Sequence, residues 1–183
     1  MSKKTGAIAA VVVGLLLVMA YLVDQGQRVN FNEGYQPEQP IAFSHKIHAG
    51  DNQIQCLYCH FGAEQGRHAG VPPTELCLNC HKITKKDSPE VQKIHQALKS
   101  GEPVAWIKVN HFPDFAYFNH AQHVKVGKVS CQECHGPVET MDRVKQVGNL
   151  SMGWCLDCHR QKNISPPNDH KSAKGGDCAR CHY

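Results

Sequence analysis

Cys56-Leu57-Tyr58-Cys59-His60 is one of five Cys-x-x-Cys-His motifs, which together use all ten cysteines of the chain. The other four are Cys77-Leu78-Asn79-Cys80-His81, Cys131-Gln132-Glu133-Cys134-His135, Cys155-Leu156-Asp157-Cys158-His159 and Cys178-Ala179-Arg180-Cys181-His182. In this pattern the two thiols form thioether bonds to porphyrin vinyl groups, and the histidine ligates the iron as its proximal ligand. The sequence therefore predicts five c-type haems, numbered here in motif order.

Two other readings of the cysteine pairs are less consistent with the motif. Cys-x-x-Cys pairs also form zinc ribbons, and an extracytoplasmic chain can hold several disulfides. Neither explains a histidine after every pair. Because histidine makes up only 13 of 183 residues, five such histidines arise by chance with a probability of about two in a million.

An apolar stretch near the N-terminus predicts a membrane anchor. Residues 7–23 read AIAAVVVGLLLVMAYLV and follow Lys3 and Lys4. As a helix they reach about 25 Å, the short end of a membrane span. A cleaved signal peptide has a similar layout. We expect residues 1–23 to form a transmembrane helix that places the rest of the chain on the outer, periplasmic side of the bacterial inner membrane.

The remaining chain divides into a short linker and a haem domain. Residues 24–41 are polar, rich in Gln and Pro, and are expected to form a stalk. Residues 42–183 offer too little chain per haem for an ordinary apolar core. We therefore expect a mostly irregular domain with short α-helices, wrapped around five haems that form its core.

One helix is predicted away from the motifs. Ser88 suits an N-cap, Pro89 the first helical position, and Gly101 the residue after the end. The expected apolar stripe is Val91, Ile94 and Leu98, with His95 on the same face.

The charge balance gives no sign of a nucleic-acid partner. The formal net charge is +4, but the haem propionates would subtract about one unit per ferric haem.

An internal repeat supplies candidates for the sixth, distal iron ligands. Phe43-Ser44-His45-Lys46-Ile47-His48 precedes Cys56 as Phe118-Asn119-His120-Ala121-Gln122-His123 precedes Cys131, with the two histidines 11 and eight residues ahead of the cysteine in both copies. Such a match indicates duplication of a haem-binding unit. We expect His45 and His120 to ligate haems 1 and 3, and the second histidine of each copy, His48 and His123, to ligate neighbouring haems.

The fifth distal ligand is left open by the sequence. His68, His111, His170 and Met141 are all available, and methionine would raise the potential of its haem. Met141 is favoured for haem 4. The aromatic residues Phe112, Phe115, Tyr117 and Phe118 are expected to pack on haem faces, where they would exclude water.

The Phe-x-His-x-x-His element followed by Cys-x-x-Cys-His resembles class III multihaem cytochromes. The longer stretches that carry the resemblance are FSHKIHAG at 43–50, GRHAGVPPTELCLNCHK at 66–82, PDFAYFNHAQH at 113–123, CHGPVETM at 134–141 and MGWCLDCHR at 152–160. Together with five motifs and one N-terminal helix, they resemble the pentahaem cytochrome c subunit of bacterial alternative complex III.

That resemblance implies an electron-transfer subunit with no bond chemistry of its own. Its implied partners are integral membrane subunits that oxidise quinol, an iron–sulfur subunit, and a monohaem cytochrome c or a terminal oxidase.

The alternative function is a self-sufficient, membrane-anchored multihaem quinol dehydrogenase that feeds a periplasmic reductase. Proteins of that class carry a methionine two residues after a first-motif histidine, whereas His60 is followed by Phe61 and Gly62. A multihaem reductase would need an open or lysine-ligated haem, and no Cys-x-x-Cys-Lys motif occurs.

Overall fold

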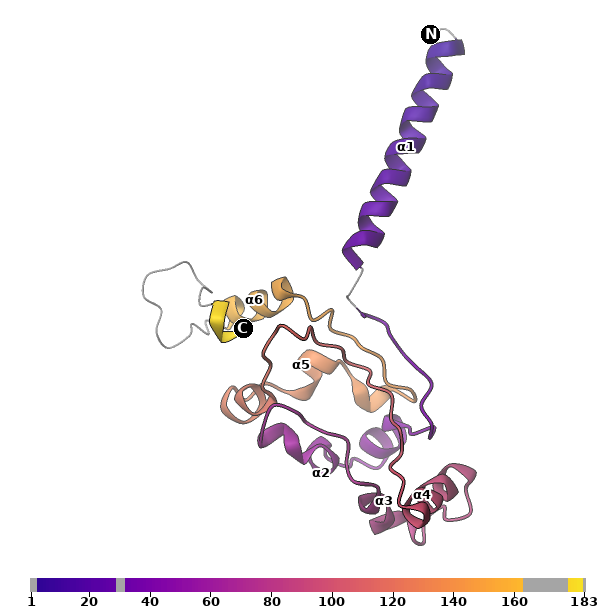
Figure 1. Ribbon diagram of the computed structural model, residues 1–183, viewed down its shortest axis with the longest axis vertical. Helices are drawn as coiled ribbons and strands as arrows, with labels where there is room; N and C mark the ends of the chain where they lie inside the picture. Colours follow the sequence, from indigo (N-terminus) through magenta and orange to yellow (C-terminus); the bar gives the residue numbers. More distant parts are fainter. Residues whose placement is uncertain (1–2, 29–31, 163–177, 183) are drawn as a thin grey trace. The chain divides into compact units, whose positions relative to one another are not determined.

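The computed structural model describes residues 3–28, 32–162 and 178–182 (Figure 1). The chain divides into two compact units, Met1–Asn32 and Glu33–Tyr183.

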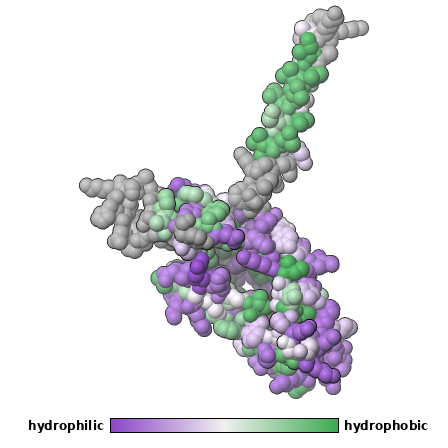
Figure 2. Space-filling model, in the orientation of Figure 1, coloured by the Kyte–Doolittle hydropathy of each residue, from purple (hydrophilic) through white to green (hydrophobic). Residues whose placement is uncertain are grey.

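The first unit consists of helix α1, Lys3–Arg28. Its apolar side chains are exposed, and Ile8, Leu15, Leu16 and Tyr21 are each more than 60% exposed. Figure 2 shows apolar residues along the visible face of the helix. Among the described residues, no helix combines the length and the apolar character needed to cross a bilayer. The expected helix is therefore present, but the transmembrane span predicted for it is not supported.

The second unit is built from short helical segments and irregular chain. After α1 come η1 (Lys46–Asp51), α2 (Cys56–Cys59), η2 (Phe61–Glu64), α3 (Thr74–His81), α4 (Pro89–Ser100), η3 (Gln122–Val126), α5 (Cys131–His135), η4 (Val138–Thr140), α6 (Met152–Gln161) and η5 (Cys178–Arg180). In the described part of the chain the only β-type pairing is an isolated bridge between Ala116 and His182. This confirms the predicted class of short helices joined by irregular chain.

The predicted helix at residues 89–100 is confirmed as α4. Pro89 occupies its first turn, and Gly101 ends it in the left-handed region with φ 74°. Val91 and Ile94 are buried as expected. Ser88 takes the N-cap position, but its side chain makes no capping hydrogen bond.

The expected stalk differs from what the structure contains. Helix α1 continues to Arg28, and the chain from Glu33 onward belongs to the second unit. Two backbone hydrogen bonds join this stretch to Gln146, one from Gly34 N to its carbonyl oxygen and one from its amide to Tyr35 O, at 2.8 and 3.0 Å. Polar composition predicts free chain, but here polar groups of the stretch bind the rest of the unit.

The apolar core of the second unit is small. Among its described residues, the buried hydrophobic ones are Ile41, Ala63, Val91, Ile94, Val129 and Met141, and the visible surface of the unit is largely hydrophilic (Figure 2). Six side chains are too few to organise about 150 residues through burial alone. Such a domain needs another apolar body inside it.

The sequence repeat packs as a reciprocal pair. The first copy places η1 against η4 of the second, and the second copy places η3 against η2 of the first. The backbone contacts correspond: Lys46 N donates to Met141 O, and Ala121 N donates to Gly66 O, both at 3.0 Å. Both residues of the second bond are related to those of the first by a shift of 75 positions. The two copies thus contact one another as the halves of a two-fold dimer do.

Candidate haem sites

Every Cys-x-x-Cys-His motif lies on a helical turn. The first four motifs begin or lie within α2, α3, α5 and α6, and the fifth begins η5. Residues three and four positions apart lie on the same face of a helix. This geometry directs both cysteines and the histidine of a motif toward one side, as covalent attachment to a porphyrin requires.

Two motif histidines face the first histidine of a repeat copy. His45 and His60 have ring centroids 6.4 Å apart and planes within 5° of each other. His120 and His135 reproduce this arrangement at 6.4 Å and 2°. The duplicated sequence therefore gives duplicated geometry.

Two further pairs join the second histidine of each copy to a later motif. His48 lies 6.0 Å from His81, with an interplanar angle of 60°. His123 lies 6.0 Å from His159, at 23°.

These separations fit a metal ion between the two rings. Two imidazoles on opposite sides of one ion, with bonds of about 2.0 Å and ring centres about 1.2 Å behind the nitrogens, have centroids about 6.4 Å apart. Aromatic pairs without a metal also have centroids about 4.5–7 Å apart, so the distance counts here because each pair contains the histidine of a Cys-x-x-Cys-His motif. The donor set and its spacing thus fit a six-coordinate haem iron.

Hydrogen bonds prepare several of these rings for ligation. The Nδ1 atoms of His60, His81 and His120 lie 2.7–2.8 Å from the backbone carbonyl oxygens of Gly70, Thr84 and Arg67. A carbonyl can only accept, so Nδ1 carries the proton and Nε2 keeps its lone pair for the metal.

In His48 and His123, the second histidine of each repeat copy, Nδ1 also donates to a backbone carbonyl, which here belongs to the same helical turn. His48 Nδ1 donates to Ser44 O and His123 Nδ1 donates to Asn119 O, both at 2.8 Å. The acceptor is four residues earlier in each copy.

Burial keeps several of the rings neutral. It lowers the pKa of His45 to about 4, with further contributions from His60 and His48. Burial also lowers the pKa of His135 and of His159, aided by the facing His120 and His123. Neutral imidazole is the form that binds metal.

Comparisons with known proteins agree with this geometry. Residues 116–183 match the family described as "Cytochrome c7 and related cytochrome c". The chain is also 32% identical over 167 residues to the protein named "Menaquinone reductase, multiheme cytochrome c subunit" of Nitratidesulfovibrio vulgaris strain Hildenborough, an alignment that covers 80% of this chain and 78% of the relative.

The chain belongs to the multihaem cytochromes c. Its cofactor is therefore c-type haem.

The family assignment answers the rival readings of the cysteines. In cytochromes c, the two cysteines of the motif bind haem covalently and its histidine ligates the iron.

Phenylalanines of the repeat pack against both histidines of their own copy. Phe43 stacks on His48 at 4.2 Å and meets His45 edge-on at 4.9 Å. Phe118 stacks on His123 at 4.6 Å and meets His120 edge-on at 4.8 Å. Sequence reasoning assigned Phe118 to a haem face and missed the role of Phe43, although both begin the repeated Phe-x-His-x-x-His element.

Met141 does not take the place expected of it opposite His159. That place is occupied by His123. Met141 is buried, 9% exposed, and its backbone binds Lys46 and Val138. Its position is that of a core residue between the two repeat copies.

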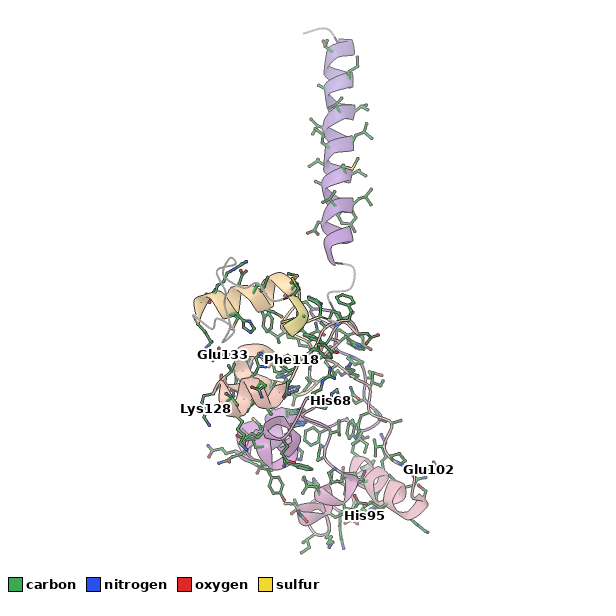
Figure 3. The ribbon with its side chains drawn as sticks, turned by 60° about the vertical axis from the view of Figure 1, so that its left-hand side comes forward. His68, His95, Glu102, Phe118, Lys128 and Glu133 are labelled. Atoms are coloured by element: carbon green, nitrogen blue, oxygen red, sulfur yellow. The ribbon has the colours of Figure 1, made fainter. Side chains whose placement is uncertain are left out.

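The other candidates for a distal ligand differ in their contacts and exposure. His111 is tied to its own loop, where its Nε2 lies 3.0 Å from Lys108 O and its ring meets Tyr35 edge-on at 5.7 Å. His68 is exposed on the loop of residues 66–70, in the middle of the unit (Figure 3). His170 lies outside the described residues.

The fifth motif has an aromatic neighbour. Phe115 lies 5.8 Å from His182 with planes 25° apart, and Tyr117 N donates to Cys181 O at 2.6 Å. Of the expected aromatic residues, Phe115 thus packs directly on a motif histidine, while Phe112 packs on Phe118.

Neighbouring motifs approach one another in a definite order. Burial raises the pKa of Cys131, and the nearby thiol of Cys56, which occupies the equivalent position in the repeat, adds to this effect. Burial raises the pKa of Cys59, and the nearby thiol of Cys77 adds to this effect. The pKa of Cys134 is raised to about 11 by burial and then by Cys158.

The last contact in the order joins motifs 4 and 5. The pKa of Cys155 is raised by burial and then by the thiol of Cys181. Within the second unit, α3 lies at one end, α6 and η5 at the other, and α2 and α5 between them (Figure 1). The motifs therefore succeed one another in space as 2, 1, 3, 4 and 5.

Proposed function

We propose that this cytochrome is the electron-transfer subunit of a quinone-linked respiratory complex, and that it carries five c-type haems. The observation that carries the proposal is the set of four opposed histidine pairs, arranged on motifs that follow one another without a gap. Closed, six-coordinate irons are suited to electron transfer and not to substrate binding.

The ligand assignment follows the pairs. Haem 1 takes His60 and His45, and haem 3 takes His135 and His120. Haem 2 takes His81 and His48. Haem 4 takes His159 and His123, and Met141 is not assigned to any iron.

For haem 5, His182 is the proximal ligand, and His68 and His170 are the candidates for the distal position. Arg67 lies 5.0 Å from the centre of the Tyr117 ring, and Tyr117 binds Cys181. The loop that carries His68 therefore reaches the neighbourhood of the fifth motif.

When bound, each haem accepts and donates one electron. The polypeptide sets the distances between haems, supplies the iron ligands and determines the polarity around each haem. The spatial order of the motifs gives a relay in the order 2, 1, 3, 4, 5. The ends of the relay, near α3 and near η5, are where donor and acceptor proteins would dock.

Helix α1 attaches the subunit to the membrane-embedded part of its complex. A helix with apolar side chains on every face needs lipid or protein around it. Because c-type haem is attached outside the cytoplasm, the haem domain lies on the outer side of the inner membrane.

The proposed partners are those of alternative complex III: integral quinol-oxidising subunits, an iron–sulfur subunit, and a monohaem cytochrome c or a terminal oxidase. Native purification in mild detergent tests this, with subunit identification and a quinol oxidation assay on the same fraction. Co-purification of these subunits, with activity lost when they are stripped away, is the expected result. A lone cytochrome that oxidises quinol would favour the self-sufficient dehydrogenase.

The name of the relative supports a second candidate, in which electrons flow in the opposite direction. That protein is a subunit of a menaquinone reductase. The same purified complex tests the direction when it is supplied with a reduced periplasmic cytochrome and oxidised menaquinone analogue. Quinone reduction faster than quinol oxidation would favour this candidate.

A further inference from the structure

The loop of residues 66–70 contacts ligands of two different haems. At one end, Gly70 O accepts a hydrogen bond from His60 Nδ1 at 2.7 Å. At the other, Arg67 O accepts one from His120 Nδ1, also at 2.7 Å. In the proposed assignment His60 belongs to haem 1 and His120 to haem 3.

The loop is held in place by other backbone contacts. Gly66 O accepts a hydrogen bond from Ala121 N at 3.0 Å, and Arg67 O also lies 3.4 Å from His120 N. A Cβ atom built on Gly62 would lie only 2.7 Å from His68 O and 2.8 Å from Ala69 O. The loop backbone therefore rests directly on the turn that follows the first motif.

The corresponding loop of the other repeat copy does not do the same. Residues 141–145 stand 75 positions further along, and Met141 O accepts from Lys46 N as Gly66 O accepts from Ala121 N. Yet His45 Nδ1 is buried with no hydrogen-bond partner. The backbone contact is repeated, but the contact with the ligand ring is not.

Haems 1 and 3, which are neighbours in the spatial order, thus each have one hydrogen-bonded ligand, and both bonds come from one loop. Within the described residues, no hydrogen bond is made by the ring of His135, the second ligand of haem 3, just as none is made by that of His45. The equivalent bonds of His48, His81 and His123 end on other segments.

We propose that the loop of residues 66–70 is a positioning element that tunes haems 1 and 3 together. A hydrogen bond from Nδ1 to a carbonyl increases the electron donation of the imidazole to the iron. Stronger donation stabilises the ferric state and lowers the potential. Displacement of this one loop then raises both potentials at once. The proposal rests on the ligand assignment given above.

Gly62→Ala tests the proposal, because the added methyl group must push the loop carbonyls away. Two variants are matched controls. Gly66→Ala adds the same methyl group to the loop at a position with no atom within 4 Å. His68→Ala removes the loop side chain and leaves the backbone, so it separates any role of His68 at haem 5.

The measurement is a redox titration of each five-haem protein, followed by optical and electron paramagnetic resonance spectra. The expected result is that Gly62→Ala raises the midpoint potentials of two haems, apart from any change at haem 5 that His68→Ala also produces. Neither control should shift those two. A shift of one potential, or of none, would overturn the shared tuning.

A second variant covers the case in which Gly62→Ala yields no holoprotein. Gly70 has φ 75°, so Gly70→Ala strains the loop at the end that serves His60. It is expected to raise the potential of one haem, and an unchanged titration would refute the idea. Haem count and low-spin spectra report separately on the ligand assignment: five low-spin haems with unmoved potentials would reject the loop inference alone.

Discussion

At the scale of single residues, four histidines from two short segments each face the histidine of one motif. Within each copy, the first histidine pairs with the motif that follows in the same copy, and the second pairs with the next motif along the chain. His-x-x-His on one turn directs its rings to adjacent sites. The exchange of His123 for alanine therefore tests whether this ring is the distal ligand of haem 4.

We expect His123→Ala to leave the haems covalently attached and to convert one of them to a high-spin, five-coordinate form. His123 lies opposite His159 at 6.0 Å, and its loss leaves that side of the iron without a protein ligand. Absorption and electron paramagnetic resonance spectra measure the change.

Met141→Ala is the control. Met141 is buried, so its truncation is expected to lower the free energy of unfolding by about 2–4 kcal/mol with all haems still low-spin. If instead Met141→Ala opened an iron and His123→Ala did not, methionine would be the ligand of haem 4.

Phe118 offers a second test at this scale. Its ring contacts both His120 and His123, so Phe118→Ala removes packing from the two rings proposed as distal ligands. We expect a loss of about 2 kcal/mol in unfolding free energy, since each aromatic contact contributes about 0.5–1.5 kcal/mol. Denaturant titration of the holoprotein gives the value. Phe61→Ala, at a ring that is 49% exposed, should lower the free energy of unfolding by much less than Phe118→Ala does.

At the scale of elements, the sequence predicted those parts whose signals are local. Helix α4 follows from Pro89 and Gly101, since a first-turn proline and a left-handed end are each encoded within a few residues. The paired histidines also follow from a local signal, because the two copies repeat the same spacing.

Other elements depend on distant partners and could not be predicted. The chain from Glu33 to Ile41 is fixed by hydrogen bonds to Arg143, Gln146 and Ile107, about 70–110 positions away in the sequence. The carbonyl partners of His60 and His120 are backbone atoms of a loop, and a backbone carbonyl has no side-chain signature. The reciprocal packing of the copies likewise needed the three-dimensional arrangement.

That reciprocal packing predicts the effect of Gly50→Ala. A Cβ atom on Gly50 would overlap the carbonyl group of Glu139, at the contact between η1 and η4. Since the neighbour is backbone, relief requires the two segments to separate, at a cost of about 1–3 kcal/mol. Urea denaturation of the holoprotein measures the loss. Gly66→Ala meets no atom within 4 Å and should unfold at the urea concentration of the parent; equal stability of both variants would contradict the packing argument.

At the scale of the whole molecule, we expect the haems to fill the interior of the second unit, which apolar side chains fill in most domains. Only six hydrophobic residues are buried among those described. Replacement of all ten cysteines by serine is therefore expected to leave the second unit unfolded and not merely empty, because the covalent cofactor stabilises the folded state. Far-ultraviolet circular dichroism should show a loss of most helical signal. If the chain without haem kept its helices and unfolded cooperatively, the polypeptide would form a stable core by itself and the prediction would be wrong.

The division into two units makes a final prediction about how the cytochrome works in its complex. Residues 33–183, exported behind a cleavable signal, should yield a soluble protein with the haem spectrum of the parent, since the haem-bearing segments and their described contacts lie in the second unit. The same protein should be absent from membranes and should not support quinone-linked electron transfer, because it lacks the apolar surface of α1. Fractionation and respiratory assays, with the full chain exported in parallel, measure both effects. Membrane association and full activity of the truncated protein would assign attachment to the haem domain, and the exposed apolar side chains of α1 would then require another partner.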